Sequence, residues 1–100
     1  MIKVFKLING EELIAKTAVT ALGYTLEDPA AIVIQQTEKG VGVGLAPYMP
    51  YAESTIVLYA SAIASEATPN TNMANEYNRI FGSGIEVVSA SALSGLKMAS

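Results

Sequence analysis

The stretch that decides the fold lies near the start of the chain, where residues 5–15 have the sequence Phe-Lys-Leu-Ile-Asn-Gly-Glu-Glu-Leu-Ile-Ala. Asn9 and Gly10 separate two runs rich in β-branched and apolar residues, Ile2–Ile8 and Glu11–Thr20. An Asn-Gly pair favours a type I′ hairpin turn, because both residues tolerate the positive φ angles that this turn requires. The sequence therefore predicts an antiparallel β-hairpin at the start of the chain.

Three further strands are predicted downstream of this hairpin. The first is a long strand made of Tyr24–Asp28 and Ala31–Thr37, which bends at Pro29 because proline lacks the N–H that a sheet ladder needs. Such a bend inside one strand is typical of a small, strongly curved barrel. The remaining expected elements are a strand at Val41–Ala46, a loop at Pro47–Ser54 and a last long strand at Thr55–Ala64.

The pattern then changes from strand to helix. Apolar residues recur at the spacing of one helix face, which predicts a helix over about residues 70–81. Thr68 is expected to cap this helix, with Pro69 at its first position, and Gly82 is expected to end it. The apolar residues of this face are Met73, Tyr77, Ile80 and Phe81.

The predicted fold is mostly β, with five strands in a small, strongly bent barrel and one C-terminal helix. We expect a single domain over residues 1–88, with the barrel at 2–64, the helix at about 70–81 and a final strand at 85–88. Residues 89–100 are small and polar without a period, which indicates a loose tail.

The composition is unusually apolar, because 51% of the 100 residues are hydrophobic and only 15% are charged. Average proteins carry about 25% charged residues. One interpretation is an apolar core in a small monomer. The other is that further copies of the chain cover part of the apolar surface.

Several classes of function are disfavoured by residues that the chain lacks. It has no cysteine and no histidine, so the commonest metal ligand and general base are both missing. Glu27 and Asp28 are adjacent on a strand and would point to opposite faces, so they form no catalytic pair. We therefore expect no enzyme activity, no cofactor and no metal. The chain shows neither a signal peptide nor a membrane span, which predicts a cytoplasmic protein.

The segment Leu7–Ala15 resembles the first signature of the Sm/LSm family, in which a strand is followed by an Asn-Gly turn, an acidic residue and an apolar residue. Glu12 and Leu13 occupy the acidic and apolar places, whereas Ala15 stands where the family usually has glycine. The chain also resembles the short Sm-like proteins of tailed phages, which share the start, a later Asp-Pro, a Gly-x-Gly strand and a Pro-Tyr loop.

The resemblance implies a homo-oligomeric ring in which the fourth strand of one copy pairs with the fifth strand of the next. Here these strands would be Val41–Ala46 and Thr55–Ala64. Alternating glycines in the first of them would leave a bare strip for a neighbouring backbone. Rings of about five to seven copies are all compatible with such closure. The expected interface residues are Val41, Gly42, Val43, Gly44, Ile56, Val57, Leu58 and Tyr59.

The resemblance also implies binding of RNA or single-stranded DNA at the pore loops, although the family's RNA-binding residues are missing from the corresponding stretches, residues 20–24 and 47–54. The net charge of −3 does not favour nucleic acid either. The alternative is a structural or adaptor ring that binds protein. For the tyrosines, the alternative to base stacking is a role in plugging the barrel or the seam between copies. The candidate nucleic-acid-binding residues are Lys3, Lys6, Tyr24, Lys39, Tyr48 and Tyr51.

Overall fold

The computed structural model describes residues 1–53 and 55–81. The chain divides into two compact units, Met1–Pro69 and Asn70–Ser100, which we describe separately. The predicted stop at Gly82, the final strand at 85–88 and the tail at 89–100 lie outside the described residues.

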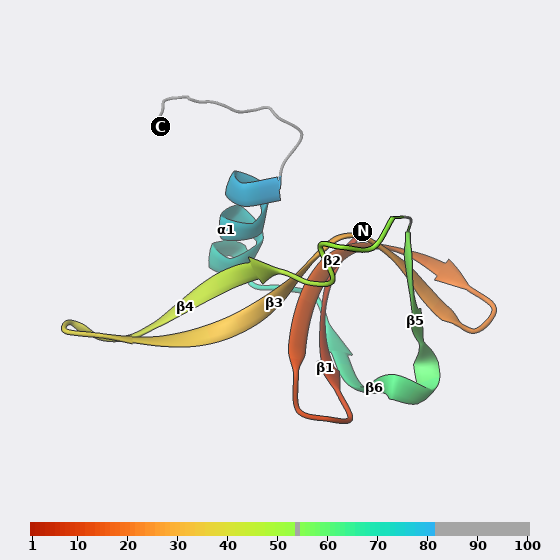
Figure 1. Ribbon diagram of the computed structural model, residues 1–100, viewed down its shortest axis with the longest axis horizontal. Helices are drawn as coiled ribbons and strands as arrows, with labels where there is room; N and C mark the ends of the chain where they lie inside the picture. Colours follow the sequence, from red (N-terminus) through yellow and green to blue (C-terminus); the bar gives the residue numbers. More distant parts are fainter. Residues whose placement is uncertain (54, 82–100) are drawn as a thin grey trace. The chain divides into compact units, whose positions relative to one another are not determined.

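The first unit is an antiparallel sheet of six strands (Figure 1). The neighbours along the sheet are β4-β3-β2-β1-β6, and β5 also pairs with β3. Together with the one helix among the described residues, this confirms the prediction of a mostly β fold, whereas the predicted count of five strands is wrong. The strands are β1 (Ile2–Leu7), β2 (Glu12–Thr20), β3 (Gly23–Thr37), β4 (Gly40–Pro47), β5 (Ile56–Tyr59) and β6 (Ile63–Ala67).

The predicted hairpin joins β1 and β2, but its turn is not of type I′. Gly10 has a φ of +93°, whereas Asn9 does not take a positive φ. The Gly10 N–H donates to the Leu7 carbonyl at 2.9 Å, and the Leu7 N–H donates to the Glu11 carbonyl at 2.8 Å. This is a three-residue connection in which glycine supplies the left-handed position. The Asn9 side chain instead accepts a hydrogen bond from the Glu11 N–H.

The predicted bend in the long strand β3 is confirmed. In its pairing with β2, Ala30 lies opposite Ile14 and Glu27 lies opposite Lys16, so β3 holds one residue more than β2 between these pairs. Asp28 adopts a φ of +51° at this point, directly before Pro29. An extra residue of this kind is a β-bulge, which bends the strand and increases its twist.

The predicted last strand, Thr55–Ala64, is broken in the structure. β5 pairs with β3, then a 3₁₀ turn, η1 (Ala60–Ala62), redirects the chain, and β6 pairs with β1 at the other side of the sheet. The Ala60 N–H donates to the Leu22 carbonyl at 2.9 Å and thereby fixes the corner. Ala60–Ala62 have lower β propensity than residues 55–59, but the turn of the chain at this point depends on a tertiary hydrogen bond that the local sequence does not indicate.

The core of the sheet unit lies between the inward faces of its strands. Phe5 and Leu7 alternate on β1, and Leu13 and Ala15 alternate on β2. Full burial of a side chain as large as Phe5 or Leu13 stabilises the fold by about 1.5–3 kcal/mol relative to its exposure. Leu26 and Leu58 complete the buried cluster, and the half-buried side chains packed against it include Tyr24, Tyr48, Ile56 and Ile63.

The second unit contains the helix α1 (Thr71–Phe81), close to the predicted range. The predicted cap is wrong. The side chain of Asn70 accepts the Met73 N–H at 2.8 Å, so Asn70 caps the helix and Pro69 lies before it. Tyr77 is fully buried. Among the described residues, no helix is long and apolar enough to cross a membrane.

Candidate assembly edges and binding residues

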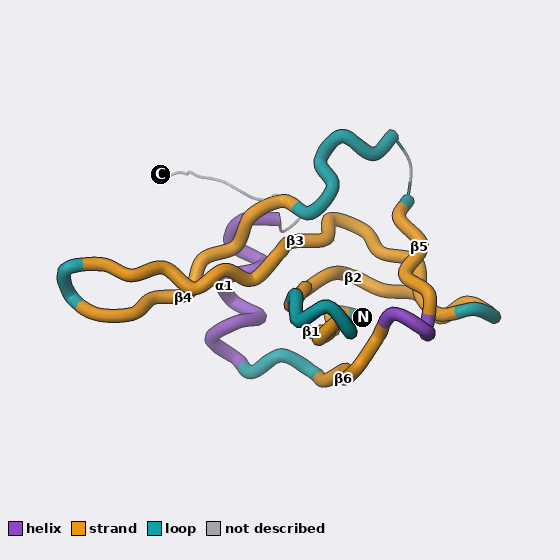
Figure 2. The backbone as a smooth tube through the Cα atoms, turned by 60° about the horizontal axis from the view of Figure 1, so that its bottom comes forward, coloured by secondary structure: helices purple, strands orange, loops and turns teal. Residues whose placement is uncertain are grey.

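The two ends of the sheet are strand edges without a partner in the described part of the chain. β4 pairs with the second half of β3, and β5 pairs with the first half, so both lie along the same edge of β3. The opposite end of the sheet is β6. Figure 2 shows β4 and β5 following β3 in turn, with the loop between them turned outward. Each open edge presents N–H and C=O groups to which another strand can bind.

This topology changes the pairing that the resemblance implied. Val41–Ala46 and Ile56–Tyr59 belong to one edge of the sheet, so they do not provide its two different edges. The second edge is β6, of which the predicted strand Thr55–Ala64 included only the beginning. The edges differ from the prediction because the chain turns at η1 and passes from one edge of the sheet to the other.

The predicted interface residues have different surroundings. Val41, Val43, Val57 and Tyr59 are exposed, whereas Leu58 is buried in the core and Ile56 packs against it. The exposed residues fit a contact between copies, whereas Ile56 and Leu58 are part of the core of their own chain. The sequence reasoning missed Ile34, which is 73% exposed and lies directly opposite Val43. The apolar alternation of Ile32 and Ile34 was the available signal.

The two glycines of β4 do not form one bare strip. A Cβ on Gly44 would lie 2.9 Å from the Gln35 side-chain nitrogen, so the Gln35 side chain of the same molecule already covers this position. A Cβ on Gly42 would meet only the Gln35 carbonyl oxygen, at 4.0 Å. Only Gly42 therefore keeps the open space that the sequence predicted for both.

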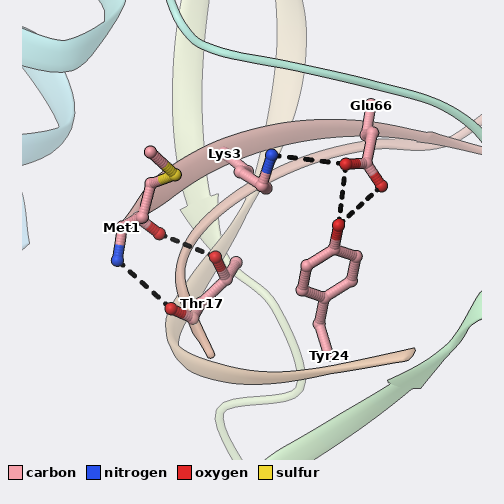
Figure 3. A network of polar contacts seen from close by, with 5 residues as sticks. All are labelled: Met1, Lys3, Thr17, Tyr24 and Glu66. Carbon is pink, nitrogen blue, oxygen red and sulfur yellow. Dashed lines mark hydrogen bonds and ion pairs between the residues drawn. The ribbon is translucent and has the colours of Figure 1, made fainter. Parts of the chain in front are cut away.

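A polar cluster joins three strands at one end of the core (Figure 3). The Tyr24 hydroxyl donates to the two carboxylate oxygens of Glu66, at 2.9 and 2.7 Å. Lys3 Nζ lies 3.3 Å from the same carboxylate and 5.9 Å from the centre of the Tyr24 ring. The Tyr24 ring also contacts the Phe5 ring, with centroids 5.2 Å apart. Two candidate nucleic-acid-binding residues, Lys3 and Tyr24, are thus engaged within the chain.

The cluster shifts the ionisation of both of its acidic groups. The hydrogen bond from Tyr24 lowers the pKa of Glu66, and Lys3 lowers it further, while burial opposes both effects. The same hydrogen bond, together with burial and the negative charge of Glu66, raises the pKa of Tyr24. Both shifts favour the pair as it stands at neutral pH, with a neutral phenol and a charged carboxylate.

The four lysines among the first 40 residues, Lys3, Lys6, Lys16 and Lys39, do not gather into one basic patch. Lys3 and Lys6 are three residues apart on β1, so their side chains lie on opposite faces of the sheet. Lys6 pairs with Glu12, and Lys16 pairs with Asp28, both at 3.8 Å. Lys39, in the turn between β3 and β4, has no ion pair within residues 1–53 and 55–81. Among the candidate lysines, Lys39 is therefore the one whose charge no acidic side chain neutralises in the described residues.

The three candidate tyrosines also differ in accessibility. Tyr24 is engaged with Glu66, and Tyr48 is half-buried against the core. Burial, followed by the charges of Glu11 and Tyr51, raises the pKa of Tyr48. Tyr51 is 81% exposed and is therefore the one of the three whose ring is open to stacking. Tyr48 thus packs against the core of its own chain, and base stacking on Tyr51 stays a prediction.

A shallow hollow of about 480 Å³ lies between the β2–β3 turn and the η1–β6 corner. Gly23 brings its walls together, because a Cβ there would meet the Leu58 carbonyl oxygen and the Ala60 nitrogen. Glu66, already bound by Tyr24 and Lys3, contributes its charge to the lining. The apolar lining includes Val19, Leu22, Ala60 and Ile63.

The part of the chain that the structure describes contains no cluster of acidic side chains that could hold a metal ion. No family model matches the chain, and no curated protein matches it.

Proposed function

We propose that this chain is an Sm-like subunit that assembles head to tail into a homo-oligomeric ring, and that the ring acts as a structural or adaptor module that binds protein. The observation that carries the proposal is the pair of unlike open edges, β4 with β5 at one end of the sheet and β6 at the other. Two different complementary edges generate a closed ring when the rotation between copies closes.

The side chains beside the edges support this assembly. Val57 and Tyr59 are exposed on β5, and no charged residue occurs in β4 or β5. Edge strands that must stay unpaired usually carry charged residues, especially lysine. β6 contributes small residues at Ala64, Ser65 and Ala67, which permit close approach, and its one charge is engaged with Lys3 and Tyr24.

The bent sheet also supports the Sm-like interpretation. The bulge at Asp28 bends β3, and the corner at η1 leads the chain from β5, which pairs with β3, to β6, which pairs with β1. In the resembled family, pairing between the sheet edges of neighbouring copies closes the ring. The exposed apolar residues favour this explanation of the composition over a monomer with a large core.

The experiment compares wild-type protein with two edge variants by light scattering at micromolar concentration. Val57→Lys places a charge beside the β5 edge, and Ala67→Lys places one beside the β6 edge. We expect the wild type to form rings and each variant alone to be monomeric. An equimolar mixture should give dimers that grow no further, because one intact β5 edge then meets one intact β6 edge. A monomeric wild type would contradict the proposal.

Binding of RNA or single-stranded DNA is the second candidate, and the exposure of Tyr51 and the unpaired charge of Lys39 support it. The ion pairs of Lys3, Lys6 and Lys16 favour the adaptor instead. Base stacking on an aromatic side chain contributes about 1–3 kcal/mol. Tyr51→Ala should therefore weaken binding of short U-rich or A-rich oligonucleotides at low salt, while Tyr48→Phe should not. If these oligonucleotides do not bind at low salt, where phosphate contacts are strongest, the adaptor function is the candidate that remains.

A further inference from the structure

The turn between β1 and β2 holds the one Asn-Gly pair of the chain, Asn9-Gly10. An asparagine before glycine is chemically labile, because glycine has no side chain to hinder the attack of its backbone nitrogen on the asparagine side-chain carbonyl carbon. Both residues are exposed, and a Cβ added to Gly10 would meet no atom within 4 Å. Solvent therefore reaches a place where the chain can modify itself.

The reaction consumes only water. The Gly10 nitrogen gives its proton to solvent and forms a bond to Asn9 Cγ. The bond from Cγ to Nδ2 breaks, and Nδ2 leaves as ammonia with a proton returned by solvent. Water then opens the cyclic imide at either of its two carbonyl carbons. One opening gives an aspartate, and the other gives an isoaspartate, in which the main chain runs through the former side chain. In both products a carboxyl group replaces the amide.

Hydrogen bonds of the folded turn engage every group that takes part in this reaction. The Gly10 N–H donates to the Leu7 carbonyl at 2.9 Å, so the proton that the nucleophile must lose is already bound. Asn9 Nδ2, the leaving group, donates to Glu11 Oε1 at 3.0 Å. Asn9 Oδ1 accepts the Glu11 N–H at 3.0 Å, which is the hydrogen bond of an Asx turn. The side chain and the backbone of Glu11 thus hold the two ends of one amide.

We propose that Asn9 is a site of spontaneous deamidation and that the Glu11 side chain restrains it. The attack builds negative charge on the Asn9 amide, and a carboxylate oxygen 3.0 Å from the amide nitrogen opposes that charge. The Glu11 N–H acts in the opposite direction, because it stabilises charge on Oδ1. That N–H belongs to the backbone, so a Glu11 substitution removes the carboxylate and keeps the N–H. The inference does not depend on the proposed ring, because a single chain contains the whole turn.

Neither product fits the turn as the amide does. In the aspartate product a carboxylate replaces the Nδ2 donor, so two carboxylates meet where Asn9 now donates to Glu11. The isoaspartate product lengthens the main chain between Leu7 and Glu11, where the Leu7 N–H donates to the Glu11 carbonyl at 2.8 Å and closes the hairpin. We therefore expect deamidation to loosen the end of the hairpin between β1 and β2.

Incubation of the full chain in mildly alkaline buffer tests the proposal. Peptide mapping by mass spectrometry follows the mass gain of amide-to-carboxyl conversion at Asn9. We expect wild-type Asn9 to deamidate several-fold more slowly in native buffer than in concentrated guanidinium chloride, where the turn is open. This comparison needs no substitution. Equal rates under the two conditions would overturn the restraint by the turn, and absence of conversion in the denaturant would overturn the site itself.

Three variants then isolate the Glu11 side chain. In native buffer Glu11→Ala should deamidate several-fold faster than the wild type. Glu11→Gln loses the charge but keeps an oxygen that can accept from Asn9, so its rate should lie between the two. Glu12→Ala is the matched control, because the neighbouring Glu12 pairs with Lys6, and it should keep the wild-type rate. All four proteins should react at one rate in the denaturant.

Circular dichroism shows whether Glu11→Ala is folded, and if it is not, the comparison of Glu11→Gln with Glu12→Ala decides. A folded Glu11→Ala that deamidates no faster than Glu12→Ala would overturn the role of Glu11. The same holds for Glu11→Gln where it carries the comparison.

Discussion

The Tyr24 hydroxyl donates to Glu66 across 42 positions of sequence and joins β3 to β6, two strands that do not pair with each other. The contact therefore braces the sheet where no backbone ladder does. Lys3 on β1 completes the brace from the strand that pairs with β6.

Glu66→Gln should reduce the acid sensitivity of folding. The pKa of Glu66 is lowered in the folded chain from an ordinary value of 4.5. A carboxylate of this kind stabilises the fold above that value, and its contribution is lost as the pH falls through the folded pKa. The free energy of unfolding, measured with urea, should fall less between pH 7 and pH 3 in Glu66→Gln than in the wild type. An equal pH dependence of the free energy of unfolding in the two proteins would contradict a stabilising role of the Tyr24–Glu66 contact.

Gly23→Ala should destabilise the sheet unit by about 1–3 kcal/mol, the usual cost of forcing extra atoms into a packed site. Its Cβ would meet the backbone of Leu58 and Ala60, and backbone atoms at the corner cannot move aside as a flexible side chain can. Chemical denaturation measures the change. Gly42→Ala is the control, since its Cβ meets one atom at 4.0 Å, and a comparable loss there would argue against the corner as the cause.

Asn70→Ala should lower the stability of α1 by about 1 kcal/mol, the typical cost of removing an N-cap side chain. The Asn70 side chain satisfies the Met73 N–H, which has no partner inside the helix. Circular dichroism during thermal unfolding measures the loss of helix. Thr68→Ala should have little effect, and the reverse order of the two variants would restore Thr68 as the cap.

Tyr48→Ala should cost more stability than Tyr51→Ala. The Tyr48 side chain packs against the core, whereas Tyr51 is largely exposed. Replacing a large aromatic residue in a core costs about 3–5 kcal/mol, and the half-buried Tyr48 should cost less than this. Exposed substitutions usually stay within about 0.5 kcal/mol. Urea midpoints for the two variants provide the comparison.

Local patterns predicted the first four strands and the helix, because these elements follow from neighbouring residues. The Asn9-Gly10 hairpin and the bend at Pro29 both follow from backbone limits on single residues, and the helix follows from its apolar spacing. The turn type was wrong because Gly10 alone supplies the positive φ. The cap was wrong because Asn70, two residues after Thr68, accepts the Met73 N–H, and asparagine is by type the more favourable N-cap residue.

Long-range pairing was less accessible to prediction. The corner at η1 depends on the hydrogen bond between Ala60 and Leu22, which are far apart in sequence. Without it, residues 55–64 look like one strand, and β4 and β5 look like two separate edges. Most candidate site residues were also predicted from their residue type alone, as lysines for phosphate contacts and tyrosines for base stacking. Their partners, such as Glu66 for Lys3 and Tyr24, come from a distant strand that no local pattern identifies.

The corner at Ala60–Ala62 has a consequence for how many copies close a ring. In the proposed ring this corner connects the strand that would accept one neighbour with the strand that would accept the other, so its angle would set the rotation from each copy to the next. Insertions in the outward loop before β5 leave that rotation untouched. A small change in the corner itself would alter the number of copies in the proposed ring.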